Sequence, residues 1–230
     1  MTTQVTFKSK SGQTAKGELA EPAANSGGKH GAIVLVQEWW GVDDHIKSLV
    51  DRMAKEGFLV VAPDLYHGVV VPRSKPDEAM KHMQALDTLK AVDEIAGAVA
   101  FLKEHAHANG KVGVMGFCLG GGLTLASACH IPGLSGAVAF YGTPPDEKVD
   151  WTKTTAPIMM HIAQKDEWVT VARGEDVKKK VEAAGKTKVE LHTYDANHAF
   201  VNDQRPDAYS PENAKLAWER TVAFFKKHLA

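Results

Sequence analysis

Cysteine is scarce in this sequence, with two residues, Cys118 and Cys129, in a chain of 230. If both lie on one helix, their eleven-residue separation corresponds to about 16 Å of helix rise. A disulfide spans no more than about 7 Å between Cα atoms. We therefore expect two free thiols, which is typical of a protein in a reducing compartment.

An excess of charge of one sign is also missing, because 27 Lys and Arg residues oppose 28 Asp and Glu residues. Nucleic-acid backbones and anionic lipid surfaces are bound through a basic excess, so neither is an expected partner. Long hydrophobic runs are absent as well: residues 31–36 and 58–62 form the longest ones, far too short to span a bilayer. The first residues lack the charged-then-apolar order of a signal peptide, so a cytoplasmic location is the default expectation.

What the sequence does contain is an ordinary globular composition, 44% hydrophobic and 24% charged. A chain of this length buries roughly 70% of its unfolded surface and can form one sizeable core. No linker, repeat or low-complexity tract interrupts it, so we expect a single domain over residues 1–230. The sequence leaves the oligomeric state open, and a monomer is the working expectation.

Short apolar runs alternate with helical patterns along the chain. Nearly continuous apolar runs, typical of strands buried on both faces, fall at residues 32–36, 58–62, 112–115, 137–140, 158–162 and 189–193. Two earlier segments predict an antiparallel hairpin at one sheet edge, at residues 4–8 and 15–20. Amphipathic stripes predict helices at residues 43–56, 88–105, 171–184 and from Ser210 onward. This alternation indicates an α/β fold with a mostly parallel sheet of about eight strands and helices on both faces.

The most specific motif is the segment 116–120, Gly-Phe-Cys-Leu-Gly, which stands between a predicted strand and a predicted helix. This is the pattern of a nucleophile elbow with cysteine in place of serine, and it predicts an α/β-hydrolase fold. A Cβ atom at Gly116 or Gly120 would clash with neighbouring backbone in such a strained turn. The helix N-terminus would favour the thiolate of Cys118, and the N–H of Leu119 is placed to hold a developing oxyanion. The alternative is a small buried cysteine in a glycine-rich turn, the interpretation that we adopt for Cys129.

Two more candidate residues follow predicted strands in the order that this fold uses: nucleophile, acid, histidine. Asp166 comes after the strand at 158–162, and His198 follows the strand that ends near Tyr194. We expect Asp166 to orient His198, and His198 to act as the base toward Cys118. Alone, Asp166 could cap the next helix and His198 could be a surface histidine, but the ordered set of three makes coincidence a poor explanation.

These segments resemble the dienelactone hydrolases, the carboxymethylenebutenolidases of the α/β-hydrolase fold. The resemblance covers nearly the whole chain, and Gly-Phe-Cys-x-Gly-Gly is its most specific part. The matching stretches are residues 36–41 (VQEWWG), 62–66 (APDLY), 116–121 (GFCLGG), Asp166, 198–200 (HAF) and 217–221 (AWERT).

The resemblance implies a role for Glu38, because in this family a glutamate after the third strand contacts the resting thiol and takes part in its activation. Glu38 stands between an apolar strand and two tryptophans, where a carboxylate accepts a proton more readily than in water. A solvated loop acid is the alternative. The backbone N–H of Trp39 would then be the second oxyanion donor, beside that of Leu119.

Several residues are candidates for the substrate pocket. The aromatic candidates lie on expected carboxyl-edge loops or strand ends: Trp39, Trp40, Tyr141, Trp168 and Phe200. We favour Trp39 and Phe200 as pocket walls and leave the others open between pocket wall and plain packing.

The basic pocket candidates are Arg73 and Arg205. Dienelactone hydrolases of chloroaromatic degradation grip the substrate carboxylate with arginines, one of them four residues after the catalytic histidine. That position is Asn202 here, and asparagine cannot replace a bidentate arginine. The exact substrate therefore stays open, although the reaction class does not.

No phosphate-binding glycine loop or Cys-x-x-Cys motif is present, so we expect no cofactor and no metal. His105 and His107 follow a predicted helix, and we expect their side chains to point apart at a solvated helix end. The predicted function is a cofactor-independent hydrolase of small lactones or esters with a Cys-His-Asp triad. Alternatives are an acyltransferase or another hydrolase with the same triad, or a non-catalytic ligand-binding or redox-sensing module based on Cys118.

Overall fold

A computed structural model describes residues 1–23 and 28–230. The strands are β1 (Thr3–Lys8), β2 (Thr14–Ala20), β3 (His30–Val36), β4 (Leu59–Pro63), β5 (Ala108–Phe117), β6 (Gly136–Phe140), β7 (Ile158–Ala163) and β8 (Val189–Tyr194). The helices are α1 (Asp44–Lys55), α2 (Pro76–Ala85), α3 (Thr88–Glu104), α4 (Leu119–His130), α5 (Val171–Ala183) and α6 (Pro211–Leu229), with short 3₁₀ turns η2 (Asp146–Lys148) and η3 (Trp151–Lys153).

The strands form one eight-stranded sheet in the order β1-β2-β4-β3-β5-β6-β7-β8. The β1–β2 and β2–β4 pairs are antiparallel, and the pairs from β4 through β3 to β8 are parallel. The expected fold class is confirmed, and so is the hairpin at one edge, while β8 forms the other edge. The carboxyl ends of the parallel strands consequently meet at one side of the sheet, where open α/β folds bind their ligands.

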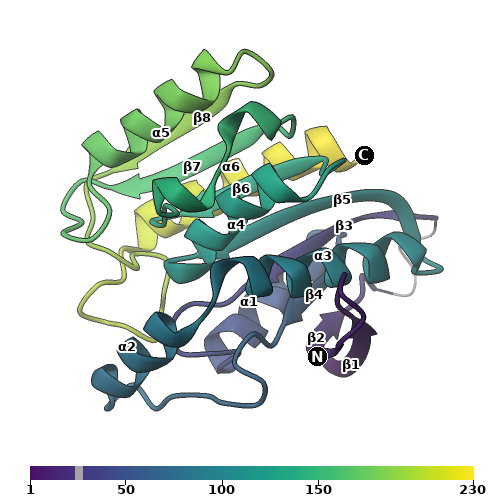
Figure 1. Cartoon of the computed structure of the whole chain (residues 1–230). Helices are drawn as coiled ribbons and strands as arrows, with labels where there is room; N and C mark the ends of the chain where they lie inside the picture. The colour runs from purple at the N-terminus through teal and green to yellow at the C-terminus, as the bar shows by residue number, and fades with distance from the viewer. Residues whose placement is uncertain (24–27) are drawn as a thin grey trace.

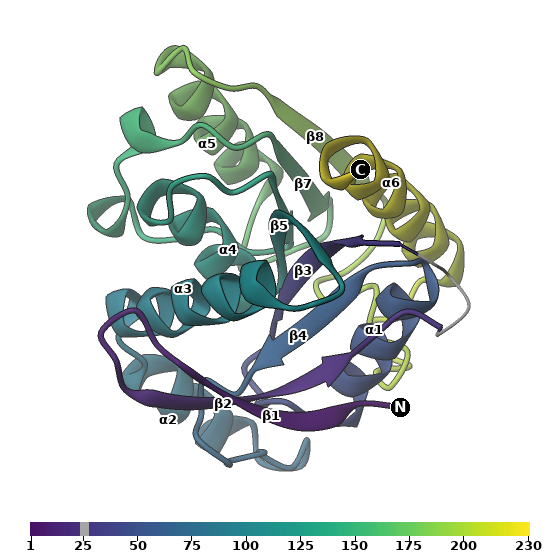
Figure 2. The same ribbon diagram turned by 90° about the vertical axis from the view of Figure 1, so that its right-hand side faces the viewer.

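Helices cover both faces of the sheet, as Figures 1 and 2 show. Helices α1 and α6 lie on one face, and α3, α4 and α5 lie on the other. The α1 and α6 side buries large apolar side chains such as Ile46, Met53 and Phe225 against the sheet. No helix of the described residues is long and apolar enough to cross a membrane.

Helix α2 is an element that the sequence patterns did not predict. It begins at Pro76, a residue preorganised for the first helical position. Ala79 is its one buried residue, so the helix has no apolar stripe that periodicity could reveal. In Figure 1 it lies at one end of the molecule, away from the sheet layer.

The expectation that His105 and His107 point apart is wrong. Helix α3 ends at Glu104, and His105 has extended backbone angles. The two rings therefore lie 5.5 Å apart, and Nδ1 of His107 lies 2.6 Å from a carboxylate oxygen of Glu21. Nδ1 of His105 accepts the amide N–H of His107 at 3.3 Å, which places the ring proton on the other nitrogen of His105.

Candidate active site

Cys118 occupies the turn between β5 and α4 with φ 54° and ψ −117°, a left-handed conformation that L residues rarely adopt. Glycines on either side make this turn sterically accessible. A Cβ at Gly116 would meet the carbonyl oxygen of Gly120, and one at Gly120 would come within 2.5 Å of the Gln37 oxygen. The expected need for both glycines is confirmed, and the turn has the strained geometry of a nucleophile elbow.

The Cys118 side chain stands at the N-terminus of α4, where backbone N–H groups and the helix dipole favour a negative charge. The amide N–H groups of Leu119 and Trp39 have no hydrogen-bond acceptor among the described residues. Both residues line cavity regions that also include Cys118. Two unpaired donors near a thiol are the elements from which an oxyanion site is built.

Asp166 contacts His198 and caps its own loop with separate oxygens. Its Oδ2 lies 2.7 Å from Nδ1 of His198, and its Oδ1 accepts the N–H groups of Trp168 and Val169 at 2.8 and 3.0 Å. The Asp166 side chain is fully buried. Asp166 therefore contacts the histidine and holds its own loop, but it does not cap the next helix, because Thr170 is the residue that caps α5.

The imidazole of His198 faces Cys118 across the same cavity. Burial is the largest influence on its pKa and acts to lower it, but hydrogen bonds with Asp166 and Cys118, and their negative charges, raise that pKa to about 10. His198 is therefore an imidazolium at neutral pH, and it lines the same cavity as the Cys118 sulfur. A neighbouring imidazolium favours the reactive form of a cysteine nucleophile.

Glu38 is buried in the same region, with 3% of its surface exposed. Nδ2 of Asn202 donates to Oε2 at 2.7 Å, and the Tyr141 hydroxyl donates to Oε1 at 3.4 Å. Burial, followed by the charges of Glu38 and Cys118, raises the pKa of Tyr141, which keeps this phenol protonated as a donor. Two neutral donors thus hold a buried carboxylate beside the thiol, and the solvated-loop alternative for Glu38 is excluded.

The cavity around Cys118 has two parts. One part has a volume of about 220 Å³ and is lined by Glu38, Trp39, Trp40, Met83, Cys118, Trp168, His198, Ala199 and Arg205. The other has a volume of about 310 Å³ and extends along the loop after β6. Cys118, His198, Met83 and Trp168 line both parts, so the thiol lies where they meet.

Four of the aromatic candidates line this cavity and one does not. Trp39, Trp40 and Trp168 line the smaller part, where the Trp39 ring lies 5.0 Å from Trp40 and 5.8 Å from Trp168. Tyr141 lines the larger part. Phe200 is a correction to the expected pocket wall, because it is fully buried in the core between Tyr141 and Tyr194.

The two arginine candidates take different positions. Arg205 lines the smaller part of the cavity and pairs with Asp207. Arg73 lines neither part. Its guanidinium binds the Asp43 carboxylate at 2.7 Å and lies over the Trp40 ring, so Arg73 connects the loop after β4 to the start of α1.

Some cavity residues escaped the sequence analysis. Met83 comes from α2, and Thr88 from the start of α3. The loop after β6 contributes residues 142–145, and a Cβ at Gly142 would collide with the carbonyl oxygen of Cys118. No motif marks these positions. The Gly-Thr-Pro-Pro run after a buried strand was the one available signal, since such loops border the sites of α/β proteins.

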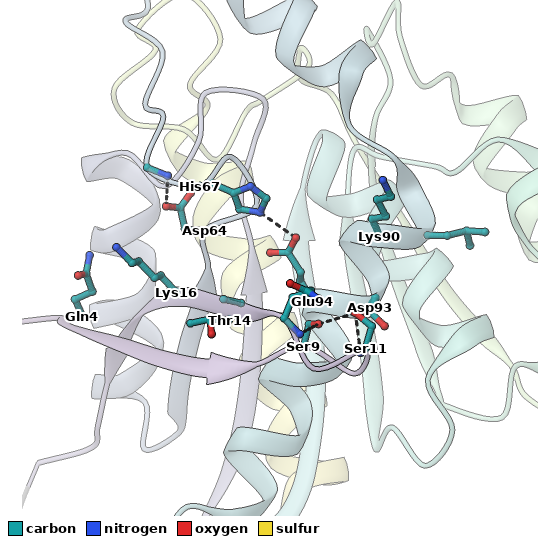
Figure 3. A pocket seen from close by; sticks show the side chains of 14 residues that line it. Gln4, Ser9, Ser11, Thr14, Lys16, Asp64, His67, Lys90, Asp93 and Glu94 are labelled. Carbon is teal, nitrogen blue, oxygen red and sulfur yellow. Dashed lines mark hydrogen bonds and ion pairs between the residues drawn. The ribbon is translucent and has the colours of Figure 1, made fainter.

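A larger cavity of about 840 Å³ lies elsewhere, between the β1–β2 hairpin and α3 (Figure 3). Its polar side chains bind one another: Asp93 accepts from Ser11 at 2.7 Å, and His67 lies 3.0 Å from Glu94. Neither Cys118 nor His198 lines it. We place the active site at Cys118 because reactive groups converge there, although that cavity is smaller.

Comparisons with known proteins show the family to which the chain belongs. The model of the dienelactone hydrolase family matches residues 16–229. "Protein usf" of Aquifex pyrophilus is 39% identical over 229 residues, 96% of each chain, and a candidate carboxymethylenebutenolidase of Aquifex aeolicus is 36% identical, covering 86% of this chain and 88% of that relative. The crystal structure of a candidate dienelactone hydrolase from Klebsiella pneumoniae superposes with a TM-score of 0.84 at 27% identity, covering 97% of this chain and 99% of the other.

Proposed function

The chain belongs to the dienelactone hydrolase family and is a hydrolase, and from that premise we propose that it cleaves small lactones or esters with Cys118, His198 and Asp166 as a catalytic triad. The observation that carries the proposal is the 2.7 Å contact between Asp166 and His198, made where His198 faces a cysteine on a strained elbow. No cofactor takes part in the proposed reaction.

In the first half-reaction the Cys118 thiolate attacks the carbonyl carbon and forms a C–S bond. The carbonyl π electrons move to oxygen, where the free N–H groups of Trp39 and Leu119 hold the oxyanion. When the intermediate collapses, the C–O bond breaks and the leaving enolate or alkoxide takes a proton from His198. The pKa of about 10 makes His198 a protonated acid for that step at neutral pH.

In the second half-reaction water attacks the thioester. His198, now neutral, takes a proton from that water, and the second tetrahedral intermediate expels the Cys118 thiolate. The products are the carboxylic acid and the restored imidazolium–thiolate pair. Asp166 keeps the Nδ1–H of His198 directed at its own oxygen throughout, so that Nε2 is the nitrogen that exchanges protons with the substrate.

Glu38 is proposed to take part in thiol activation, as the family resemblance implies. It lines the same part of the cavity as Cys118 and His198. Hydrogen bonds from Asn202 and Tyr141 fix its position. A carboxylate there can receive the thiol proton when substrate binding drives water out of the cavity, and it returns that proton to the Cys118 thiolate when the product leaves.

The substrate carboxylate, where there is one, is proposed to bind Arg205. This is the one arginine among the residues that line the two parts of the cavity, and 31% of its side chain is exposed. Trp39, Trp40 and Trp168 offer flat apolar walls to a planar ring. A small lactone that bears a carboxylate satisfies both features.

The test is hydrolysis of a carboxylated dienelactone by the wild type and by Cys118→Ala, with Cys129→Ala as the matched control. We expect turnover in the wild type and in Cys129→Ala, and a loss of several orders of magnitude in Cys118→Ala. Retained activity in the Cys118 variant would exclude the cysteine nucleophile.

The acyltransferase alternative predicts a new ester or thioester product when alcohols or thiols are added. The redox-sensing alternative predicts that Asp166 and His198 can be lost without effect.

A further inference from the structure

The two parts of the active-site cavity differ in chemistry. The smaller part contains two ionisable side chains besides the proposed triad, Glu38 and Arg205. The larger part contains no Asp, Glu, Lys or Arg side chain among the residues that line it. Those residues are Met83, Thr88, Cys118, Leu119, Gly122, Leu123, Tyr141, Gly142, Thr143, Pro144, Pro145, Trp168, Val169 and His198.

A carbonyl group bound at Cys118 would have one substituent in each part. The thiol lies where the two parts meet. The two free amide groups that could hold the carbonyl oxygen come from opposite sides, since Trp39 lines the smaller part and Leu119 the larger one. The acyl and alcohol groups of an ester point away from each other because the carbonyl carbon is planar. An oxygen held between the two donors therefore leaves one group on the side of each part.

We propose that the larger part binds a neutral, apolar substituent of the substrate, an alkyl chain or an aryl ring on one side of the ester bond. This inference rests on the proposed hydrolase function and adds a substrate class to it. A charged group would lose its hydration there without a partner, which is costly. An apolar group is instead bound more tightly because it leaves water, and each buried methylene raises the binding constant about fourfold.

The size of the larger part supports the same class of ligand. An apolar cavity of about 150 Å³ is large enough for benzene, and the larger part measures about 310 Å³. A small carboxylated lactone bound against Arg205 requires the smaller part alone, which measures about 220 Å³. The larger part therefore suits acyclic esters that have two dissimilar substituents.

Two ester series test the proposal. Methyl alkanoates of increasing length vary the acyl side, and alkyl acetates of increasing length vary the alcohol side. We expect kcat/KM to rise by about fourfold per methylene in one of the two series, and that series identifies the side that enters the larger part. The Thr143→Trp variant, which introduces a large ring from the half-buried wall of the larger part, should lower the ratio of long-chain to short-chain kcat/KM at least tenfold.

The controls separate this inference from the proposed function. Thr6→Trp makes the same substitution on the exposed face of β1, outside both parts of the cavity, and should leave the chain-length ratio unchanged. Val169→Trp places a large ring at another residue that lines the larger part, and it replaces Thr143→Trp if that variant does not fold. The apolar site alone would be overturned if Cys118-dependent hydrolysis occurred but kcat/KM did not change with chain length. It would also be overturned if neither variant altered the ratio of long-chain to short-chain kcat/KM. If neither series shows Cys118-dependent hydrolysis while the carboxylated dienelactone is still turned over, the apolar site is overturned and the proposed function stands. If the dienelactone is not turned over either, both are overturned.

Discussion

Asn202 donates a hydrogen bond from Nδ2 to Oε2 of Glu38 across 2.7 Å, and both side chains are buried. The amide has one orientation because its own oxygen accepts the N–H of Gln204 at 3.1 Å. The resemblance to dienelactone hydrolases of chloroaromatic degradation implies an arginine at this position. Glu38 is thus held by a neutral donor, and no guanidinium occupies position 202 to bind a substrate carboxylate.

Replacing Asn202 by leucine should weaken both stability and catalysis. The variant leaves a buried carboxylate oxygen without its donor, which costs about 1–3 kcal/mol of unfolding free energy. Glu38 is then free to move, so kcat/KM should fall as well. Urea unfolding and steady-state kinetics measure the two effects.

Asn109→Leu is the matched control for that variant. Nδ2 of Asn109 donates to the carbonyl oxygen of Leu229 at 2.7 Å, at the C-terminal end of α6. The control should lose stability and keep kcat/KM. Equal losses of activity in both variants would mean that Asn202 has no special relation to Glu38.

Asp166→Asn should lower kcat by about 10³–10⁴ without unfolding the protein. The amide oxygen can still accept the N–H groups of Trp168 and Val169, which now bind Oδ1. The amide nitrogen would then face Nδ1 of His198 and act as a donor. Nδ1 must then accept, so the ring proton of the neutral histidine moves to Nε2, the atom that should take a proton from the attacking water.

Circular dichroism would show whether the Asp166 variant keeps its fold. Asp195→Asn is its control, because this exposed aspartate pairs with Lys165 and lies in the loop before His198. Wild-type kinetics in the Asp166 variant would remove this residue from the proposed triad.

The elbow and the positions of the buried strands were predictable because local sequence patterns specify them. A Gly-x-Cys-x-Gly turn between strand and helix has few conformations, and nearly continuous apolar runs favour buried parallel strands. Helix α2 has no such signal, because Ala79 is its one buried residue, although its Met83 lines the cavity. The place of Phe200 on a carboxyl-edge loop predicts a pocket wall, but the ring is buried in the core. The positive φ of Ala199 is a local feature that no residue pattern showed.

Catalysis should decline at alkaline pH, because His198 is the acid that protonates the leaving group. Its pKa is raised to about 10, so the rate should fall as the pH approaches and passes that value. The free energy of unfolding should also decrease as the pH rises. A pKa above the ordinary 6.5 adds stability below pH 6.5, and this contribution is lost as the pH rises toward 10.

Unfolding free energies between pH 6.5 and pH 10 would measure this loss in the wild type and in His198→Gln. We expect the wild type to lose stability over that range and the variant to lose less. His67→Gln is the control, since that histidine is exposed. An equal slope in the wild type and in the His198 variant would contradict the raised pKa.

The buried His161 should give the opposite pH dependence. Its Nε2 lies 3.0 Å from Oγ1 of Thr221, whose hydroxyl donates to Ala217, and its Nδ1 lies 2.7 Å from the Tyr194 hydroxyl. Nε2 must therefore carry a ring proton, and in the neutral ring Nδ1 accepts from the Tyr194 hydroxyl. Burial first, and the charges of His192 and Arg220 second, lower the pKa of His161 well below 6.5.

A lowered pKa means that the unfolded chain takes up a proton at His161 before the folded one does. Stability is then complete above pH 6.5 and declines as the pH falls below it, by up to about 2 kcal/mol at pH 5. Urea unfolding at pH 5 and pH 7.5 would measure this difference. The amide of His161→Gln can still donate and accept but does not titrate. The unfolding free energy lost on acidification should therefore be smaller by that amount in this variant, while His67→Gln should behave as the wild type. If His161→Gln kept the full acid loss, the destabilising protonation would have to occur at another group.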